Sequence, residues 1–192
     1  MTMMQLEPTA SNDQLRHGAM IIRRPILADA VAIHKLVEES ETLDMNSQYL
    51  YLLLCRDYSL TCRVAEYDSQ IIGFVTAYHP PNQRQVLFIW QVAVAETYRG
   101  RGVAMRMLVD LLAGLSEPQP WTIEATVTES NQASRNLFAS LARRLGCDLR
   151  IGEGFHASLF LPAVHEAEQM FYIGPVVAGP GTTDVQKKEA TL

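Results

Sequence analysis

The sequence lacks a surplus of basic residues and has no long apolar run. Among its 192 residues, 16 lysines and arginines stand against 21 aspartates and glutamates, and the formal net charge is -5. Such a chain is a poor general binder of nucleic acid. No apolar run approaches the roughly 18 residues of a membrane-spanning helix, and the first residues, MTMMQLEPTA, lack the basic and apolar regions of a signal peptide. We therefore expect a cytoplasmic protein.

Cysteine and histidine are scarce and lack the spacing of a metal site. Cys55, Cys62 and Cys147 are an odd number without a C-x-x-C pair, which indicates neither a disulfide framework nor a zinc site. The histidines show no ligand spacing either; they are His17, His34, His79, His156 and His165. We expect no metal, and a reducing compartment.

Length and composition predict one folded domain between two flexible ends. A chain of 192 residues suits a single domain with a sizeable core. Residues 1–19 are polar and aperiodic, and residues 174–192 are rich in glycine, proline, threonine and charge. We expect both ends to be mobile and the domain to span residues 20–173.

Hydrophobic spacing within the domain predicts an α/β chain. The expected strands are residues 20–24, 61–66, 71–78, 86–94, 121–127 and one strand after residue 146. Helices are expected to begin after Asp29, Ser47, Gly102 and either Asn131 or Ser130. Because three strands follow one another without helices, the order favours a mixed sheet flanked by helices over a regular doubly wound fold.

The stretch LDMNSQYLYLLLCRDY precedes those three strands. Ser47 can cap a helix that runs to about Cys55, and this helix is apolar on nearly every side, which predicts burial. Asp44 and Asn46 fall just before it. Read on spacing alone, they are turn residues, and Tyr49 is a core aromatic residue with an exposed hydroxyl.

Residues 86–112 read as a strand, a glycine-rich turn and a helix. Gly100 and Gly102 permit a tight turn and a close approach to a ligand, with unpaired N–H groups at the helix start. The helix dipole attracts an anion, and Arg99 and Arg101 add positive charge. The stretch predicts a phosphate-binding loop; the alternative is a plain turn with two solvated arginines.

The loop departs from the common nucleotide motifs. Val103 and Ala104 stand where a Walker loop needs Lys and then Ser or Thr, and Met105 replaces the third glycine of a dinucleotide fingerprint. The remaining pattern, Arg99-x-x-Gly102-x-Ala104, resembles the pyrophosphate signature of the GCN5-related N-acetyltransferases (GNAT), which use acetyl-CoA.

Other segments extend the resemblance over roughly residues 21–173. NQASRNLF, followed by Gly146, looks like the helix segment of that superfamily. Together, LDMNSQYLYLLLCRDY, IWQVAVAETYRGRGVAMRML, TVTESNQASRNLF and HEAEQMFYI resemble the L-2,4-diaminobutyrate acetyltransferases of ectoine biosynthesis. The resemblance implies a GNAT fold, a homodimer and acetyl transfer from acetyl-CoA to the γ-amino group of L-2,4-diaminobutyrate. The product would feed a solute that protects cells against salt.

The resemblance also implies which residues hold the coenzyme. The backbone around Val92 and Val94 is expected to pair with the pantetheine arm and to offer an N–H group to the thioester oxygen. The full implied set is Val92, Val94, Arg99, Gly100, Arg101, Gly102, Val103, Ala104, Asn131 and, more weakly, Asn136.

The implied substrate pocket consists of Asp44, Tyr49, Trp90, His165 and Glu168. Diaminobutyrate carries two ammonium groups and one carboxylate, so acids and an indole face match its charges. Without the resemblance, Trp90 reads equally well as a core residue, Asp44 as a turn residue, and His165 with Glu168 as a solvated pair in a polar connection.

The attacking amine must lose a proton, because an alkylamine is almost wholly protonated at pH 7. Glu168 is the first choice as base, His165 the second, and a water relay from Asp44 the third. Phe138 stands where many GNAT members carry a tyrosine that protonates the leaving thiolate, so that role is vacant or filled elsewhere.

Two other functions compete with this one. The chain could acetylate another amine, such as a polyamine, an aminoglycoside or a protein N-terminus, although the apolar 49–55 helix and Trp90 favour a compact pocket. It could also be a non-catalytic acetyl-CoA sensor. A sensor needs only the loop, so the acids at positions 44 and 168 disfavour it.

Overall fold

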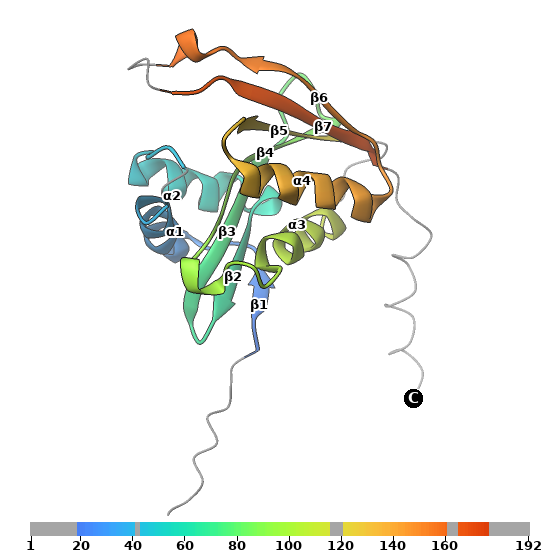
Figure 1. The fold of residues 1–192 in the computed structure, drawn as a ribbon. Helices are drawn as coiled ribbons and strands as arrows, with labels where there is room; N and C mark the ends of the chain where they lie inside the picture. Colours follow the sequence, from blue (N-terminus) through green and yellow to red (C-terminus); the bar gives the residue numbers. More distant parts are fainter. Residues whose placement is uncertain (1–18, 41–42, 116–120, 161–164, 177–192) are drawn as a thin grey trace, which may run out of the picture.

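The computed structural model describes residues 19–40, 43–115, 121–160 and 165–176. The helices and strands are β1 (Ile21–Arg23), α1 (Ala30–Glu38), α2 (Gln48–Asp57), β2 (Arg63–Tyr67), β3 (Gln70–Tyr78), β4 (Val86–Val94), α3 (Val103–Ala113), β5 (Trp121–Thr128), α4 (Gln132–Leu145), β6 (Leu149–Phe155) and β7 (Glu168–Val176) (Figure 1). The expected mobility of the two ends concerns residues that lie almost wholly outside the described ranges.

The strands form one mixed sheet in the order β1-β2-β3-β4-β5-β7-β6. Among the described strands only β4 and β5 pair in parallel, so the prediction of a mixed sheet flanked by helices is confirmed. Two strands follow α4 where the sequence predicted one, and β7 runs to Val176, past the expected domain end at residue 173. The edge strand β6 is mostly exposed and holds two glycines, which weakens the apolar pattern of a strand.

Helix termini follow the predictions, but two expected side-chain caps are wrong: Ser47 directly precedes α2 without a side-chain hydrogen bond to the helix, and Asp29 does not cap α1. The side chain of Asn131 caps α4 by accepting a hydrogen bond from Ser134 N at 3.0 Å, and Gly146 ends the helix at φ 64°. Asp29 directly precedes α1, but its carboxylate accepts from Ile26 N and pairs with Arg23 instead of capping the helix. The predicted cap at Asp29 was therefore wrong, because the Arg23 guanidinium binds its carboxylate.

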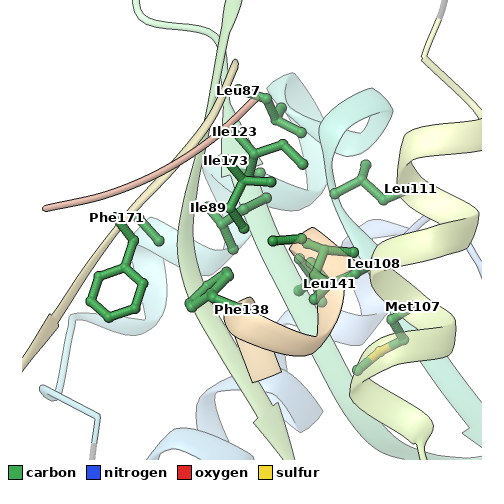
Figure 2. Packing of buried hydrophobic residues seen from close by; sticks show 14 of the residues in the cluster. Leu87, Ile89, Met107, Leu108, Leu111, Ile123, Phe138, Leu141, Phe171 and Ile173 are labelled. Carbon is green, nitrogen blue, oxygen red and sulfur yellow. The ribbon is translucent and has the colours of Figure 1, made fainter. Parts of the chain in front are cut away.

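Helices cover both faces of the sheet. On one face, α3 and α4 pack Leu108 and Leu141 against Ile89, Ile123 and neighbouring strand residues (Figure 2). On the other face, α1 and α2 enclose a second cluster that includes Ile33, Tyr51 and Phe74. Within the described ranges, no helix combines the length and apolarity needed to cross a membrane.

Helix α2 is only half buried, contrary to the prediction. Its buried residues are Tyr51, Leu54 and Cys55, whereas Tyr49 is 66% exposed and Leu52 is 37% exposed. The helix lies in the outer layer and packs against α1 along one side (Figure 1). The prediction of burial rested on apolar residues all around the helix. Those on the side away from α1 are not covered by another described element.

The middle of the sheet opens into a gap. Strands β4 and β5 are paired only between residues Val86–Phe88 and Thr122–Glu124, although both continue several residues further. Ala95 N donates to Ile72 O on the β3 side. Because backbone groups alternate in direction along a strand, those of Val94 and Val92 point to the opposite edge, into the gap.

Candidate active site

A β-bulge in β4 shapes the wall between two cavities. Thr76 of β3 pairs with Gln91 and Ala77 pairs with Ile89, so Trp90 is an extra residue on β4. The bulge reverses the alternation of the strand: Ile89 and Val92 both pack on the α3/α4 side. Trp90 is 38% exposed and lines a cavity, which rules out a fully buried core position.

A cavity of about 360 Å³ lies where the gap meets the glycine loop. It is lined by eight of the residues expected to bind the coenzyme, together with neighbouring side chains. These eight are Val92, Val94, Arg99, Gly100, Gly102, Val103, Ala104 and Asn131. We call this the coenzyme cavity.

The loop needs its glycines for their backbone conformation. Gly100 and Gly102 have φ values of 73° and 74°, and a Cβ atom at either position would meet no atom within 4 Å. A side chain would thus fit in space but strain the left-handed backbone by about 1–2 kcal/mol. The first intrahelical bond of α3 joins Arg106 N to Gly102 O, so the N–H groups just before Arg106 are left for an anion.

The arginines of the loop have different surroundings. Arg99 lies along the end of β4 and donates from Nε to Val94 O at 3.0 Å. Arg101 does not line the coenzyme cavity; its guanidinium carbon lies 5.5 Å from the centre of the Tyr98 ring, over a separate hollow. Asn136 is exposed on α4. It lines neither the coenzyme cavity nor the second cavity described below.

A second cavity, of about 370 Å³, opens beside the first. Asp44, Trp90, His165 and Glu168 line it, as the sequence predicted, although they come from distant parts of the chain. Tyr49 is not among its lining residues. We call this the amine cavity; it shares Val92, Asn131 and Ser134 with the coenzyme cavity, so the two adjoin each other.

His165 lies at the centre of the acidic group in the amine cavity. Its Nε2 atom is 3.3 Å from Asp44 Oδ2 and 3.9 Å from Glu168 Oε1, and its ring stacks on Phe160 at 4.0 Å. Its Nδ1 atom is 2.6 Å from the Glu166 carbonyl oxygen, which fixes that nitrogen as a donor. The alternative reading placed Glu168 in a polar connection, but Glu168 is the first residue of β7.

The surroundings of His165 raise its pKa above the ordinary 6.5. The main cause is the hydrogen bond to the Glu166 carbonyl, burial opposes it, and the Asp44 and Glu168 carboxylates add to the rise. The imidazolium therefore stabilises the folded state below pH 6.5, and this contribution is lost as the pH rises through the raised value.

The sequence analysis missed Gln91. This side chain is 4% exposed, lines the amine cavity and donates from Nε2 to Asp44 O at 3.3 Å. A glutamine within the apolar run VLFIWQVAV was a usable signal, because a buried amide needs hydrogen-bond partners. The run was read as continuous apolar sequence instead.

Several phenylalanines contribute to the remaining lining of the amine cavity. Phe138 is 4% exposed on α4, with its ring centre 6.2 Å from that of Phe171. It offers no hydroxyl group to the cavity. Phe155 and Phe160 contribute further apolar surface. Across the part of the chain that the structure describes, no group of three or more His, Cys, Asp or Glu side chains is arranged to hold a metal ion.

Comparisons with known proteins agree with this geometry. The model of the Acetyltransferase (GNAT) family matches residues 29–142. L-2,4-diaminobutyric acid acetyltransferase of Streptomyces avermitilis is 45% identical over 157 residues, which are 81% of this chain and 88% of the relative. The same enzyme of Halalkalibacterium halodurans is 41% identical over 155 residues, covering 81% of this chain and 82% of the relative.

A solved structure extends the likeness to the fold. Diaminobutyrate acetyltransferase EctA from Paenibacillus lautus, in complex with its substrate L-2,4-diaminobutyric acid and coenzyme A, superimposes with a TM-score of 0.79 at 35% identity. The match covers 85% of this chain and 99% of that one. The chain therefore belongs to the GNAT acetyltransferases and, within them, to the L-2,4-diaminobutyric acid acetyltransferase family.

Proposed function

We propose that this protein transfers the acetyl group of acetyl-CoA to the γ-amino nitrogen of L-2,4-diaminobutyrate, giving N4-acetyl-L-2,4-diaminobutyrate and free CoA. The adjacency of the two cavities, which share Val92, Asn131 and Ser134, carries the proposal. A thioester at the inner end of the coenzyme cavity would lie beside the shared residues Val92 and Asn131, next to the acids of the amine cavity.

Backbone groups are proposed to hold the coenzyme. The N–H groups at the start of α3 would bind the pyrophosphate, and the free edge of β4 would pair with the amides of the pantetheine arm. The N–H group of Val92 faces the same gap and would donate to the thioester oxygen. Such a donor favours the transition state, in which that oxygen becomes an anion.

The charge of the amine cavity fits a substrate with two ammonium groups. Asp44 and Glu168 supply two carboxylates, and no lysine or arginine occurs among the described residues of its lining. The exposed indole of Trp90 can face an ammonium group, an interaction of about 0.5–2 kcal/mol depending on desolvation. The relatives from Streptomyces avermitilis and Halalkalibacterium halodurans support diaminobutyrate as the substrate.

The reaction requires a neutral γ-amine, so the substrate's ammonium group first releases one proton to water. Its nitrogen attacks the thioester carbon, a C–N bond forms and the carbonyl oxygen becomes an oxyanion. Glu168 accepts a proton from the nitrogen, whose acidity rises sharply as that bond forms. The C–S bond then breaks and CoA leaves as a thiolate, a leaving group that does not require a proton from the position of Phe138.

We also propose that the enzyme works as a cytoplasmic homodimer and that its product serves the synthesis of a protective solute. Family resemblance is the support for each of these statements. Light scattering on the purified protein measures the oligomeric state: a mass of twice 21.5 kDa is expected, and a mass of 21.5 kDa would contradict the dimer.

The direct test is release of CoA thiol from acetyl-CoA in the presence of diaminobutyrate, ornithine, lysine, spermidine or no amine, followed by NMR of the product. Release with diaminobutyrate, and an acetyl group on the γ-nitrogen, are expected. Preference for another amine would overturn the substrate assignment. Coenzyme binding without turnover of any amine would favour the sensor.

A further inference from the structure

Gln91 uses its backbone and side chain to join two elements. On β3, Thr76 Oγ1 accepts from Gln91 N at 3.2 Å and lies 3.5 Å from Gln91 O. On the α2 side, Gln91 Oε1 accepts from Tyr51 OH at 3.1 Å, and Gln91 Nε2 donates to Asp44 O. A buried glutamine held at both ends of its amide has a single orientation.

The bulge explains why this side chain reaches the loop before α2. Since Trp90 is an additional residue, Gln91 has the direction that Trp90 would have in a regular strand, toward the α1/α2 side. Tyr51, which is fully buried in that layer, then meets the amide oxygen. The amide nitrogen is left to donate to the main chain of the loop.

Asp44 depends on this support. Its side chain is 71% exposed, and Asp44 Oδ2 pairs with His165 Nε2 at 3.3 Å. The main chain at Asp44 is held more firmly, because its carbonyl oxygen accepts from both Gln91 Nε2 and Asn46 Nδ2 at 3.3 Å. The Asn46 amide also approaches Tyr51 OH at 3.5 Å.

We infer that Gln91 is a positioning residue: it holds the main chain of Asp44 so that the carboxylate lies where the substrate's ammonium group binds. This inference rests on the proposed function. Gln91 acts through Asp44 and therefore affects amine binding. The glycine loop, the start of α3 and the edge of β4 facing the gap do not depend on the amide.

The central test is a double-mutant cycle between Gln91→Met and Asp44→Asn, with KM measured for both substrates. Gln91→Met keeps the length of the side chain and removes both hydrogen bonds. We expect kcat/KM for diaminobutyrate to fall about 10- to 100-fold, since small misplacements of a binding group have effects of that size. The KM for acetyl-CoA should stay within about twofold.

The cycle separates positioning from packing. In the Asp44→Asn background, Gln91→Met should change the amine KM less than about twofold, because the group that Gln91 positions is already disabled. Additive effects of the two substitutions, or an equal rise in the KM for acetyl-CoA, would overturn the inference. An inactive wild-type protein would instead refute the proposed function.

Two further variants complete the experiment. Gln169→Met is the matched control, because Gln169 is a strand glutamine whose amide accepts from Arg135 at 2.7 Å and lies outside the amine cavity; its kinetics should match the wild type.

If Gln91→Met does not fold, Tyr51→Phe tests the inference in its place. It removes the hydrogen bond to Gln91 Oε1 and the longer one from Asn46 Nδ2, and it should raise the amine KM about three- to tenfold; an unchanged amine KM would overturn the inference.

Discussion

The two cavities are built in different ways. The coenzyme cavity draws most of its lining from residues 92–105 and offers main-chain N–H groups from a strand edge and a helix start. The amine cavity draws Asp44 from the segment before α2, Trp90 from the bulge in β4, and His165 and Glu168 from just before and at the start of β7, and it offers side chains. One depends on backbone conformation and the other on individual functional groups.

This difference predicts how each half responds to substitution. Replacing most side chains of the glycine loop leaves its N–H groups in place, whereas a change of its left-handed glycines alters the backbone itself. In the amine cavity, the loss of one carboxylate removes a function that no neighbour supplies. Variants in the two halves should therefore raise different Michaelis constants.

Glu168→Gln should have the largest effect. The amide keeps the size of the side chain and cannot accept the amine proton, so kcat should fall about 10²- to 10⁴-fold, the usual contribution of a general base. Steady-state kinetics check this, with the Kd of acetyl-CoA measured by calorimetry and expected to be unchanged. Glu153→Gln on β6 is the control; a similar loss of kcat there, or full activity of Glu168→Gln, would refute the assignment of the base.

Gly102→Ala should have an intermediate effect, confined to the coenzyme. Strain of about 1–2 kcal/mol at a left-handed residue corresponds to a rise of about 5- to 30-fold in the Kd of acetyl-CoA if binding requires that conformation. Gly146→Ala is a close control, because φ is 64° and a Cβ atom there also meets nothing within 4 Å. Gly146→Ala should lower thermal stability without changing coenzyme affinity, whereas Gly102→Ala should lower coenzyme affinity, because the free loop can relax out of the strained conformation that binding requires. Equal affinities would refute the loop assignment.

His165→Gln should have the smallest effect, visible in the pH profile. Below the raised pKa of His165, the imidazolium pairs with the carboxylates and so competes with the ammonium groups of the substrate. As the pH rises through that value, the carboxylates are released and the amine KM should fall about two- to fivefold, as for an exposed ion pair. The variant should lack this step. A step that persists in His165→Gln would exclude the imidazole as its source.

The same contrast explains what the sequence could predict. The coenzyme cavity follows from neighbouring residues, because a strand, two glycines and a helix start within one stretch determine its geometry. Asp44, Trp90, His165 and Glu168 were identified through a family resemblance, since residues so far apart give no spacing rule. The structure places all four along one cavity; their roles as binding and catalytic groups remain predictions.

Several features lay beyond local patterns. The position of the bulge at Trp90 depends on the register of β3 and β4, which an apolar run does not reveal. The half exposure of α2 depends on which side of an apolar helix packs against other elements, and the sequence does not show this. Three residues expected in the site line neither cavity: Tyr49, Arg101 and Asn136. The sequence shows that each lies near a site segment along the chain, but the direction of its side chain depends on tertiary packing.

The gap between β4 and β5 has a thermodynamic consequence. Beyond Phe88, β4 is paired with β3 but not with β5, so a coenzyme bound in the gap would act as a missing strand and cross-link the two halves of the sheet. A ligand that binds only the folded state stabilises it by about 2.7 kcal/mol at 100 times its Kd. Acetyl-CoA would thus be a structural component of the sheet as well as a reactant, and the fold should resist unfolding most when the coenzyme is abundant.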